Sequence, residues 1–212
     1  MQLIGMLDSP YVRRVAISLQ LLGLPFEHRS ISVFRGFDQF RRINPVVKAP
    51  SLICDDGEVL MDSTLILEYA EALAAPRKSL MPSDVGAKQH ELRLIGLALA
   101  ACEKSVQIVY EHELRPAEKQ HGPWLTRVEG QLLAAYAALE QEVARRPFDA
   151  HGGTMTQAGV SCAVAWHFTQ SLLPDIARPA DHPALQAHSA RSEQLAEFLA
   201  APHGESTMNA AT

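Results

Sequence analysis

The sequence of 212 residues predicts an α/β domain followed by an all-helical domain. In the first 80 residues, short apolar runs alternate with amphipathic segments in the order β-α-β-α-β-β-α. Residues 76–84 contain two prolines and no periodicity, and beyond them every apolar pattern has the helical period. We therefore expect domains at residues 1–75 and 85–201, a linker at 76–84 and a polar tail at 202–212.

Composition excludes several classes of protein. Apolar residues make up 47% of the chain and charged residues 20%, an ordinary globular balance. A net charge of −5 without a long basic cluster argues against nucleic-acid binding. No apolar run approaches the roughly 20 residues of a membrane span, and no signal-peptide pattern occurs. Cys54, Cys102 and Cys162 are widely spaced, which is typical of reduced thiols in a cytoplasmic protein.

The first three elements form a β-α-β unit. Residues 2–6 are apolar and predict a strand. A helix follows Ser9, where a polar cap precedes a proline at the first helical position, and it ends before Gly23. Residues 26–32 predict a second strand. The short helical connection implies that the two strands are parallel.

A hairpin and its flanking helices complete the first domain. We expect a helix at 38–43, strands at 51–54 and 59–61, and a helix at 64–75. Gly57 can take the positive φ that the hairpin turn requires, and Pro50 precedes the first hairpin strand. Asp62 and Ser63 stand where the following helix would be capped.

Four helices are expected in the second domain, at 88–112, 123–145, 156–172 and 182–201. The third is apolar nearly all round, which predicts a buried central helix.

Three motifs carry a family resemblance. The segments D-S-P-Y-V-R-R-V, N-P-V-V-K-A-P-S-L and M-D-S-T-L-I-L-E-Y resemble, in order and spacing, the motifs of the glutathione transferases. The resemblance implies a thioredoxin-like N-terminal domain with an all-α C-terminal domain, a cis peptide bond before Pro50, and a homodimer. It also implies glutathione as a co-substrate and no other cofactor. The family's [ST]-x-x-D cap is altered here, because Gly159 replaces the aspartate, so the second domain is expected to be less stable or differently capped.

Ser9 is the candidate catalytic residue. A plain helix cap is the alternative that its position alone favours. The resemblance implies instead that its hydroxyl stabilises the thiolate of glutathione. Lowering a thiol pKa from about 8.5 by two units requires about 2.7 kcal/mol. A helix dipole of up to about 1 kcal/mol and a charged hydrogen bond of about 1.5–3 kcal/mol can supply it.

The resemblance also implies a glutathione-binding set. Asp62 would face the γ-glutamyl ammonium, and Ser63 with the helix amides would receive the γ-glutamyl carboxylate. Ala49, before Pro50, would pair with the cysteinyl backbone. Lys48 is compatible with the glycyl carboxylate and equally with a solvated surface lysine.

Other candidates retain structural alternatives. Arg13 matches the arginine of the family's first helix, where it would either touch the ligand or support the loop. Phe34, Tyr110 and Trp166 are candidate walls for a hydrophobic co-substrate, although aromatic residues at such positions are more often core.

Metal and nucleophile motifs are not found. His90-Glu91 and His112-Glu113 each lack the second histidine that a zinc motif requires, so no metal site is expected. The segment Gly159–Ala163 faintly resembles a nucleophile elbow in sequence, but no strand precedes it, so we reject this interpretation.

Two functions remain. The first is a glutathione transferase in detoxification, in which the thiolate attacks a small hydrophobic electrophile or a peroxide; transferase, peroxidase and dehalogenase activities are all compatible. The alternative is a non-catalytic glutathione-transferase-like binding or regulatory protein. A thiol-disulfide reductase is disfavoured, because Ser9 cannot form a mixed disulfide.

Overall fold

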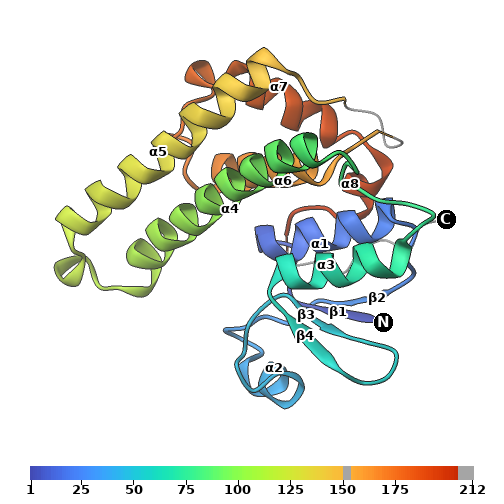
Figure 1. Cartoon of the computed structure of the whole chain (residues 1–212). Coiled ribbons are helices and arrows are strands. Elements are labelled where there is room, and N and C mark those ends of the chain that lie inside the picture. The colour runs from blue at the N-terminus through green and yellow to red at the C-terminus, as the bar shows by residue number, and fades with distance from the viewer. Residues whose placement is uncertain (150–153, 205–212) are drawn as a thin grey trace. The chain divides into compact units, whose positions relative to one another are not determined.

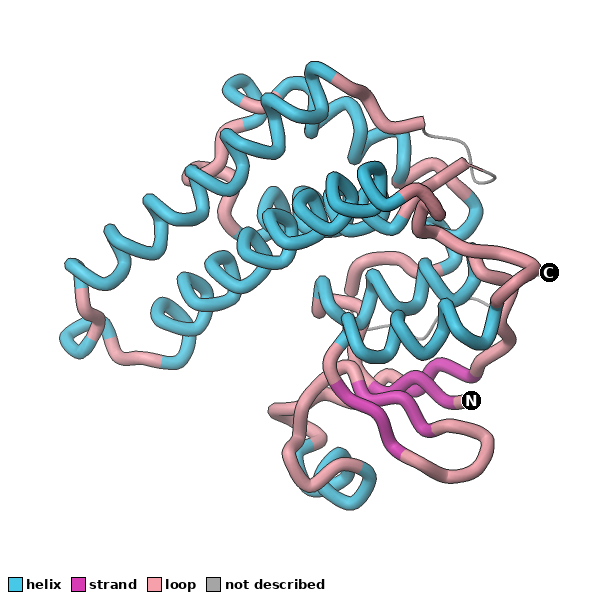
Figure 2. Tube along the Cα trace, viewed as in Figure 1, coloured by secondary structure: helices cyan, strands magenta, loops and turns pink. Residues whose placement is uncertain are grey.

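The computed structural model describes residues 1–149 and 154–204, which form two compact units (Figures 1 and 2). Residues 1–81, 154–155 and 194–204 belong to the first unit. Residues 82–149 and 156–193 belong to the second.

A four-stranded sheet lies at the centre of the first unit. Its strands are β1 Gln2–Ile4, β2 Glu27–Arg29, β3 Ser51–Ile53 and β4 Val59–Met61, in the order β2-β1-β3-β4. β1 and β2 are parallel, whereas β3 is antiparallel to both β1 and β4. The predicted β-α-β unit, hairpin and thioredoxin-like domain are therefore confirmed.

Helices cover both faces of this sheet (Figure 1). α1 Pro10–Leu21 and α3 Ser63–Ala74 lie side by side on one face, and α2 Phe37–Ile43 lies on the other. Phe40 of α2 is buried in a cluster with Ile4 and Ile31. The first helix is more deeply buried than its apolar spacing indicates, because its polar residues Arg13, Arg14 and Ser18 are buried as well.

All the regular secondary structure in the described residues of the second unit is helical. It contains α4 Val85–Leu114, η1 Ala117–Lys119, α5 Gly122–Arg145, α6 Gln157–Leu172, η2 Pro179–Asp181 and α7 Pro183–Ser192. α6 is buried along most of its length, as its apolar sequence predicts. Tyr136 donates a hydrogen bond to the Ala165 carbonyl (2.9 Å), and its hydroxyl lies 2.6 Å from that of Thr169. These bonds satisfy the buried polar groups between α5 and α6.

The N-terminus of α6 is capped differently from the family pattern, in agreement with one of the two expectations from Gly159. The Thr156 hydroxyl accepts a hydrogen bond from the Gly159 amide (3.2 Å). A carboxylate oxygen of Glu91, on α4, accepts one from the Ala158 amide (3.2 Å). A distant glutamate therefore supplies the negative charge that the family places at residue 159.

The expectation of a single helix over residues 182–201 is wrong. The chain forms α7 and a separate α8, Ala196–Ala200, with Leu195 in an extended conformation between them. This break lets Phe198 become buried, with the Arg13 guanidinium 5.7 Å from its ring centre. The contacts group α8 with the first unit rather than with the other C-terminal helices. Tertiary packing has overridden a helical sequence pattern.

None of the helices within the described parts of the chain is long and apolar enough to cross a membrane.

Candidate functional site

Three of the predicted ligand segments meet at one end of the sheet. Ile4, the last residue of β1, is paired with Ser51, the first residue of β3. Ser51 is paired in turn with Met61, the last residue of β4. The loop before α1, the loop before β3 and the start of α3 therefore leave the sheet from adjacent positions.

Ser9 is the N-cap of α1. Its hydroxyl oxygen accepts a long hydrogen bond from the Val12 amide (3.4 Å), and Pro10 occupies the first helical turn. The side chain is half-buried. Because the oxygen acts as an acceptor toward the helix, the hydroxyl proton can be donated to another group. The cap and the thiol-stabilising role are therefore compatible.

Gly5 brings the chain before Ser9 close to the β3 loop. Its φ is +137°, and a Cβ placed there would lie 2.6 Å from Val12 Cγ2 and 3.1 Å from Ala49 Cβ. The Gly5 carbonyl lies 2.7 Å from Nε2 of the buried His28. Burial lowers the pKa of His28, with the hydrogen bond acting in the opposite direction. Because a carbonyl oxygen only accepts, Nε2 of His28 donates to Gly5, and this bond holds the end of β1.

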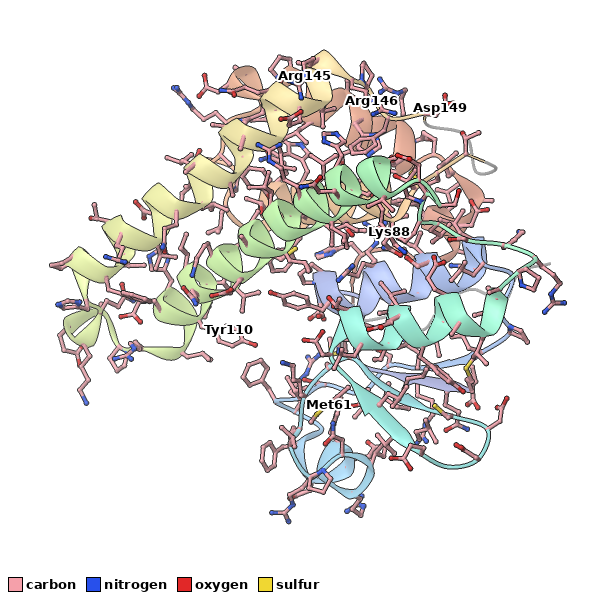
Figure 3. The ribbon with its side chains drawn as sticks, in the orientation of Figure 1. Met61, Lys88, Tyr110, Arg145, Arg146 and Asp149 are labelled. Carbon is pink, nitrogen blue, oxygen red and sulfur yellow. The ribbon has the colours of Figure 1, made fainter. Side chains whose placement is uncertain are left out.

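Asn44 organises the loop that leads into β3. Its Nδ2 donates to the Ser51 hydroxyl (2.8 Å), and its Oδ1 accepts from the Val46 amide (3.0 Å). Ser51 donates onward to the Lys48 carbonyl (2.8 Å). Asn44 Nδ2 also lies 3.4 Å from the sulfur of Met61, which Figure 3 labels.

The peptide bond between Ala49 and Pro50 is cis, as the resemblance implies. Pro50 is buried, Ala49 half-buried and Lys48 exposed. Asn44 is the first residue of the motif that contains Lys48, Ala49 and Pro50, although the motif alone indicates no role for it. The function of Asn44 in the loop depends on its hydrogen bonds with Val46 and Ser51, which follow it in the sequence.

Asp62 and Ser63 begin α3. Asp62 has a positive φ of 72°, and its Oδ1 accepts a hydrogen bond from the Thr64 amide (2.9 Å). Its Oδ2 lies 3.7 Å from Lys48 Nζ, and both side chains are about half exposed. Two residues that the resemblance assigns to different ends of glutathione are therefore adjacent here.

The two consecutive arginines of α1 have different partners. Arg13 donates from Nε to the Ala201 carbonyl (2.8 Å) and lies over the Phe198 ring, so it holds the C-terminal segment. Arg14 donates from Nη1 to the Ser63 hydroxyl (3.0 Å). The resemblance points to Arg13 and not to Arg14. The sequence feature that indicates a role for Arg14 is the pair of adjacent arginines inside a largely apolar helix.

The three aromatic candidates are divided between the units. Phe34 is exposed in the first unit, and Tyr110 is exposed on α4 of the second. Trp166 is only 1% exposed, donates a hydrogen bond to Gln186 (2.8 Å) and contacts the Tyr136 ring edge-on. This burial favours the core alternative for Trp166.

In residues 1–149 and 154–204, no group of three or more histidine, cysteine, aspartate or glutamate side chains is placed to hold a metal ion. The buried Cys54 is a free thiol whose pKa is raised mainly by burial, with a hydrogen bond to Tyr69 acting in the opposite direction.

Comparison with known proteins identifies relatives over nearly the whole chain. A family model described as the N-terminal domain of glutathione S-transferase matches residues 3–78. A glutathione transferase family member from Pseudomonas fluorescens Pf-5, crystallised with bound glutathione, is 31% identical with a TM-score of 0.81. That match covers 94% of this chain and 97% of the other.

Two further relatives are more distant. A glutathione S-transferase from Methylobacterium radiotolerans, in complex with glutathione sulfonate, is 25% identical with a TM-score of 0.86, over 100% of this chain and 99% of that one. The GST-like protein YibF of Escherichia coli K12, itself uncharacterized, is 26% identical over 167 residues, which are 78% of this chain and 81% of that protein.

Proposed function

The chain belongs to the glutathione S-transferase family, and from that premise we propose that it binds glutathione and activates its thiol for attack on a hydrophobic electrophile or peroxide. The observation that carries this proposal is the register of Ile4, Ser51 and Met61. It gathers the Ser9 cap, the cis peptide before Pro50 and the start of α3 at one end of one sheet.

Glutathione would lie along this end of the sheet. Ala49 would pair with the cysteinyl backbone, in the manner of a short added strand. Asp62 would face the γ-glutamyl ammonium, and Ser63 would receive the neighbouring carboxylate at the helix N-terminus. Lys48 would leave its contact with Asp62 (3.7 Å) and turn to the glycyl carboxylate.

Ser9 would donate its hydroxyl proton to the sulfur as a hydrogen bond. The positive end of the α1 dipole adds to this stabilisation of the thiolate. The thiol proton leaves to solvent. With an aryl halide, the thiolate adds to the halogen-bearing carbon to form the sulfur–carbon bond, and the carbon–halogen bond then breaks as halide leaves. Catalysis then consists mainly of generating the thiolate and positioning it.

A paired experiment tests the proposal. Calorimetric titration should detect glutathione binding to the wild type and weaker binding to Asp62→Ala. Conjugation of a generic aryl halide should collapse in Ser9→Ala and persist in Ser83→Ala, which removes an exposed hydroxyl from the linker. No binding heat in the wild type would remove the enzymatic proposal and favour the non-catalytic alternative. Normal conjugation by Ser9→Ala would remove the role of Ser9 alone.

The homodimer and the role in detoxification follow from the resemblance, the cytoplasmic location follows from the cysteine pattern and the absence of a signal-peptide pattern, and all three stay predictions. Light scattering on the purified chain measures directly whether it is a homodimer.

A further inference from the structure

Arg14 is a buried cation beneath the first turn of α3. It comes from α1 and is only 2% exposed. Its Nη1 lies 3.0 Å from the Ser63 hydroxyl and 3.3 Å from the Thr64 hydroxyl. One guanidinium nitrogen therefore contacts the side chains of the first two residues of α3.

This position brings a cation to the start of a helix. A helix N-terminus carries partial positive charge, so a cation beside it is unfavourable, and burial of the cation adds a desolvation cost. Arg14 thus places a hydrogen-bond donor beside Ser63, which is itself only 3% exposed. A positive potential at a helix start favours the binding of a carboxylate.

The bond also determines what the Ser63 hydroxyl can do. A guanidinium has donors and no acceptor, so Ser63 Oγ must accept the hydrogen bond from Arg14. A hydroxyl has a single proton, and in this arrangement that proton is directed to a different acceptor. Arg14 thus selects the donor orientation of Ser63 before any ligand arrives.

We propose that Arg14 is a positioning residue that holds the Ser63 hydroxyl as a hydrogen-bond donor to the α-carboxylate of the γ-glutamyl group. This role rests on the proposed binding of glutathione. Arg14 would support that binding without touching the ligand itself. Arg13, the preceding residue, provides the contrast, because its partners are Ala201 and Phe198.

A double-mutant cycle on the full chain tests this role. Arg14→Lys keeps the charge and loses the fixed geometry of the guanidinium. We expect it to weaken glutathione binding about tenfold, the equivalent of about 1.4 kcal/mol. Because Arg14 acts through Ser63, the double variant Arg14→Lys/Ser63→Ala should bind no more weakly than Ser63→Ala alone.

A ligand analogue and a control variant separate positioning from general stability. The analogue is 4-aminobutyryl-cysteinylglycine, which is glutathione without the γ-glutamyl carboxylate. Wild type and Arg14→Lys should bind this analogue equally. Arg13→Lys should leave the affinity for glutathione unchanged, since Arg13 Nε donates to the Ala201 carbonyl in the C-terminal segment.

The outcomes are distinguishable. If the wild type does not bind glutathione, the proposed function and this inference fall together. If it binds, unchanged affinity in Arg14→Lys, additive losses in the cycle, or an equal loss for the analogue would overturn the inference alone. Arg14→Met is the second variant, since a buried charge is often replaceable by an apolar side chain of similar size. Failure of both variants to fold would assign Arg14 a purely structural role and overturn the proposal.

Discussion

Gly5 determines how closely the chain before Ser9 can approach the loop before β3. With a φ of +137°, it adopts a conformation that other residues rarely take. The space beside it is already occupied by the side chains of Val12 and Ala49. A single small residue therefore permits the two loops to lie together.

Gly5→Ala should destabilise the first unit more than Gly57→Ala does. Both glycines have a positive φ, and a side chain there costs about 1–2 kcal/mol in the left-handed region. At Gly5 the added Cβ would also lie 2.6 Å from Val12 Cγ2, whereas nothing lies within 4 Å of the Cβ position at Gly57. Overpacking typically adds about 1–3 kcal/mol. Urea unfolding followed by circular dichroism measures both variants, and equal losses would contradict the packing argument.

Single residues differ in how much the sequence reveals about them. Pro50, Asp62 and Ser63 were identified because they occupy motif positions next to strand and helix ends. Arg14 and Asn44 were missed because their importance arises from partners on other segments, Ser63 and Ser51. Such pairs have no fixed sequence separation, so periodicity and spacing cannot reveal them.

At the scale of elements, local patterns located most helices and strands, and tertiary contacts decided the exceptions. α1 begins at Pro10 after the Ser9 cap, as expected. The segment 182–201 has a helical pattern but is broken before Ala196, and Phe198 of the second piece is buried against Arg13. The start of α6 likewise takes a capping carboxylate from α4.

Glu91→Ala should lower the free energy of unfolding by about 0.5–2 kcal/mol, the usual effect of losing an N-terminal cap. The Ala158 amide loses its carboxylate partner, and the helix dipole loses a compensating charge. Chemical denaturation followed by tryptophan fluorescence is suitable, since both tryptophans, Trp124 and Trp166, lie in the second unit.

Glu113→Ala is the matched control for this prediction. Glu113 lies on the same helix and is exposed, so the change should stay within about 0.5 kcal/mol. Equal stability of the two variants would contradict a capping role for Glu91.

A buried histidine links the stability of the helical unit to pH. His188 on α7 is fully buried, with Nε2 2.9 Å from the Gly159 carbonyl and its ring 4.7 Å from that of Phe148. Burial lowers its pKa to about 4, a nearby Arg191 adds to the decrease, and the hydrogen bond to Gly159 opposes it.

The second unit should therefore lose stability as the pH falls from about 6.5 to about 4. In this window the unfolded chain binds a proton at residue 188 that the folded chain does not, so protonation favours unfolding. The stabilisation by neutral His188 is present above about pH 6.5. Between pH 7 and pH 5, His188 lowers the free energy of unfolding by about 2 kcal/mol.

His188→Gln should reduce this pH dependence, because the amide can still donate to Gly159 but does not titrate. Denaturation at the two pH values, followed by tryptophan fluorescence, measures the slope. The exposed His112→Gln serves as the control. An unchanged slope in His188→Gln would contradict the assignment.

In the proposed function, the end of the sheet holds glutathione with its sulfur beside Ser9. The most direct measurement is the thiol pKa of glutathione bound to the protein, from the ultraviolet absorbance of the thiolate as a function of pH. The proposal predicts a pKa about two units below the free value of about 8.5 in the wild type. It predicts a return toward the free value in Ser9→Ala, with glutathione still bound. An identical pKa in both proteins would contradict the claim.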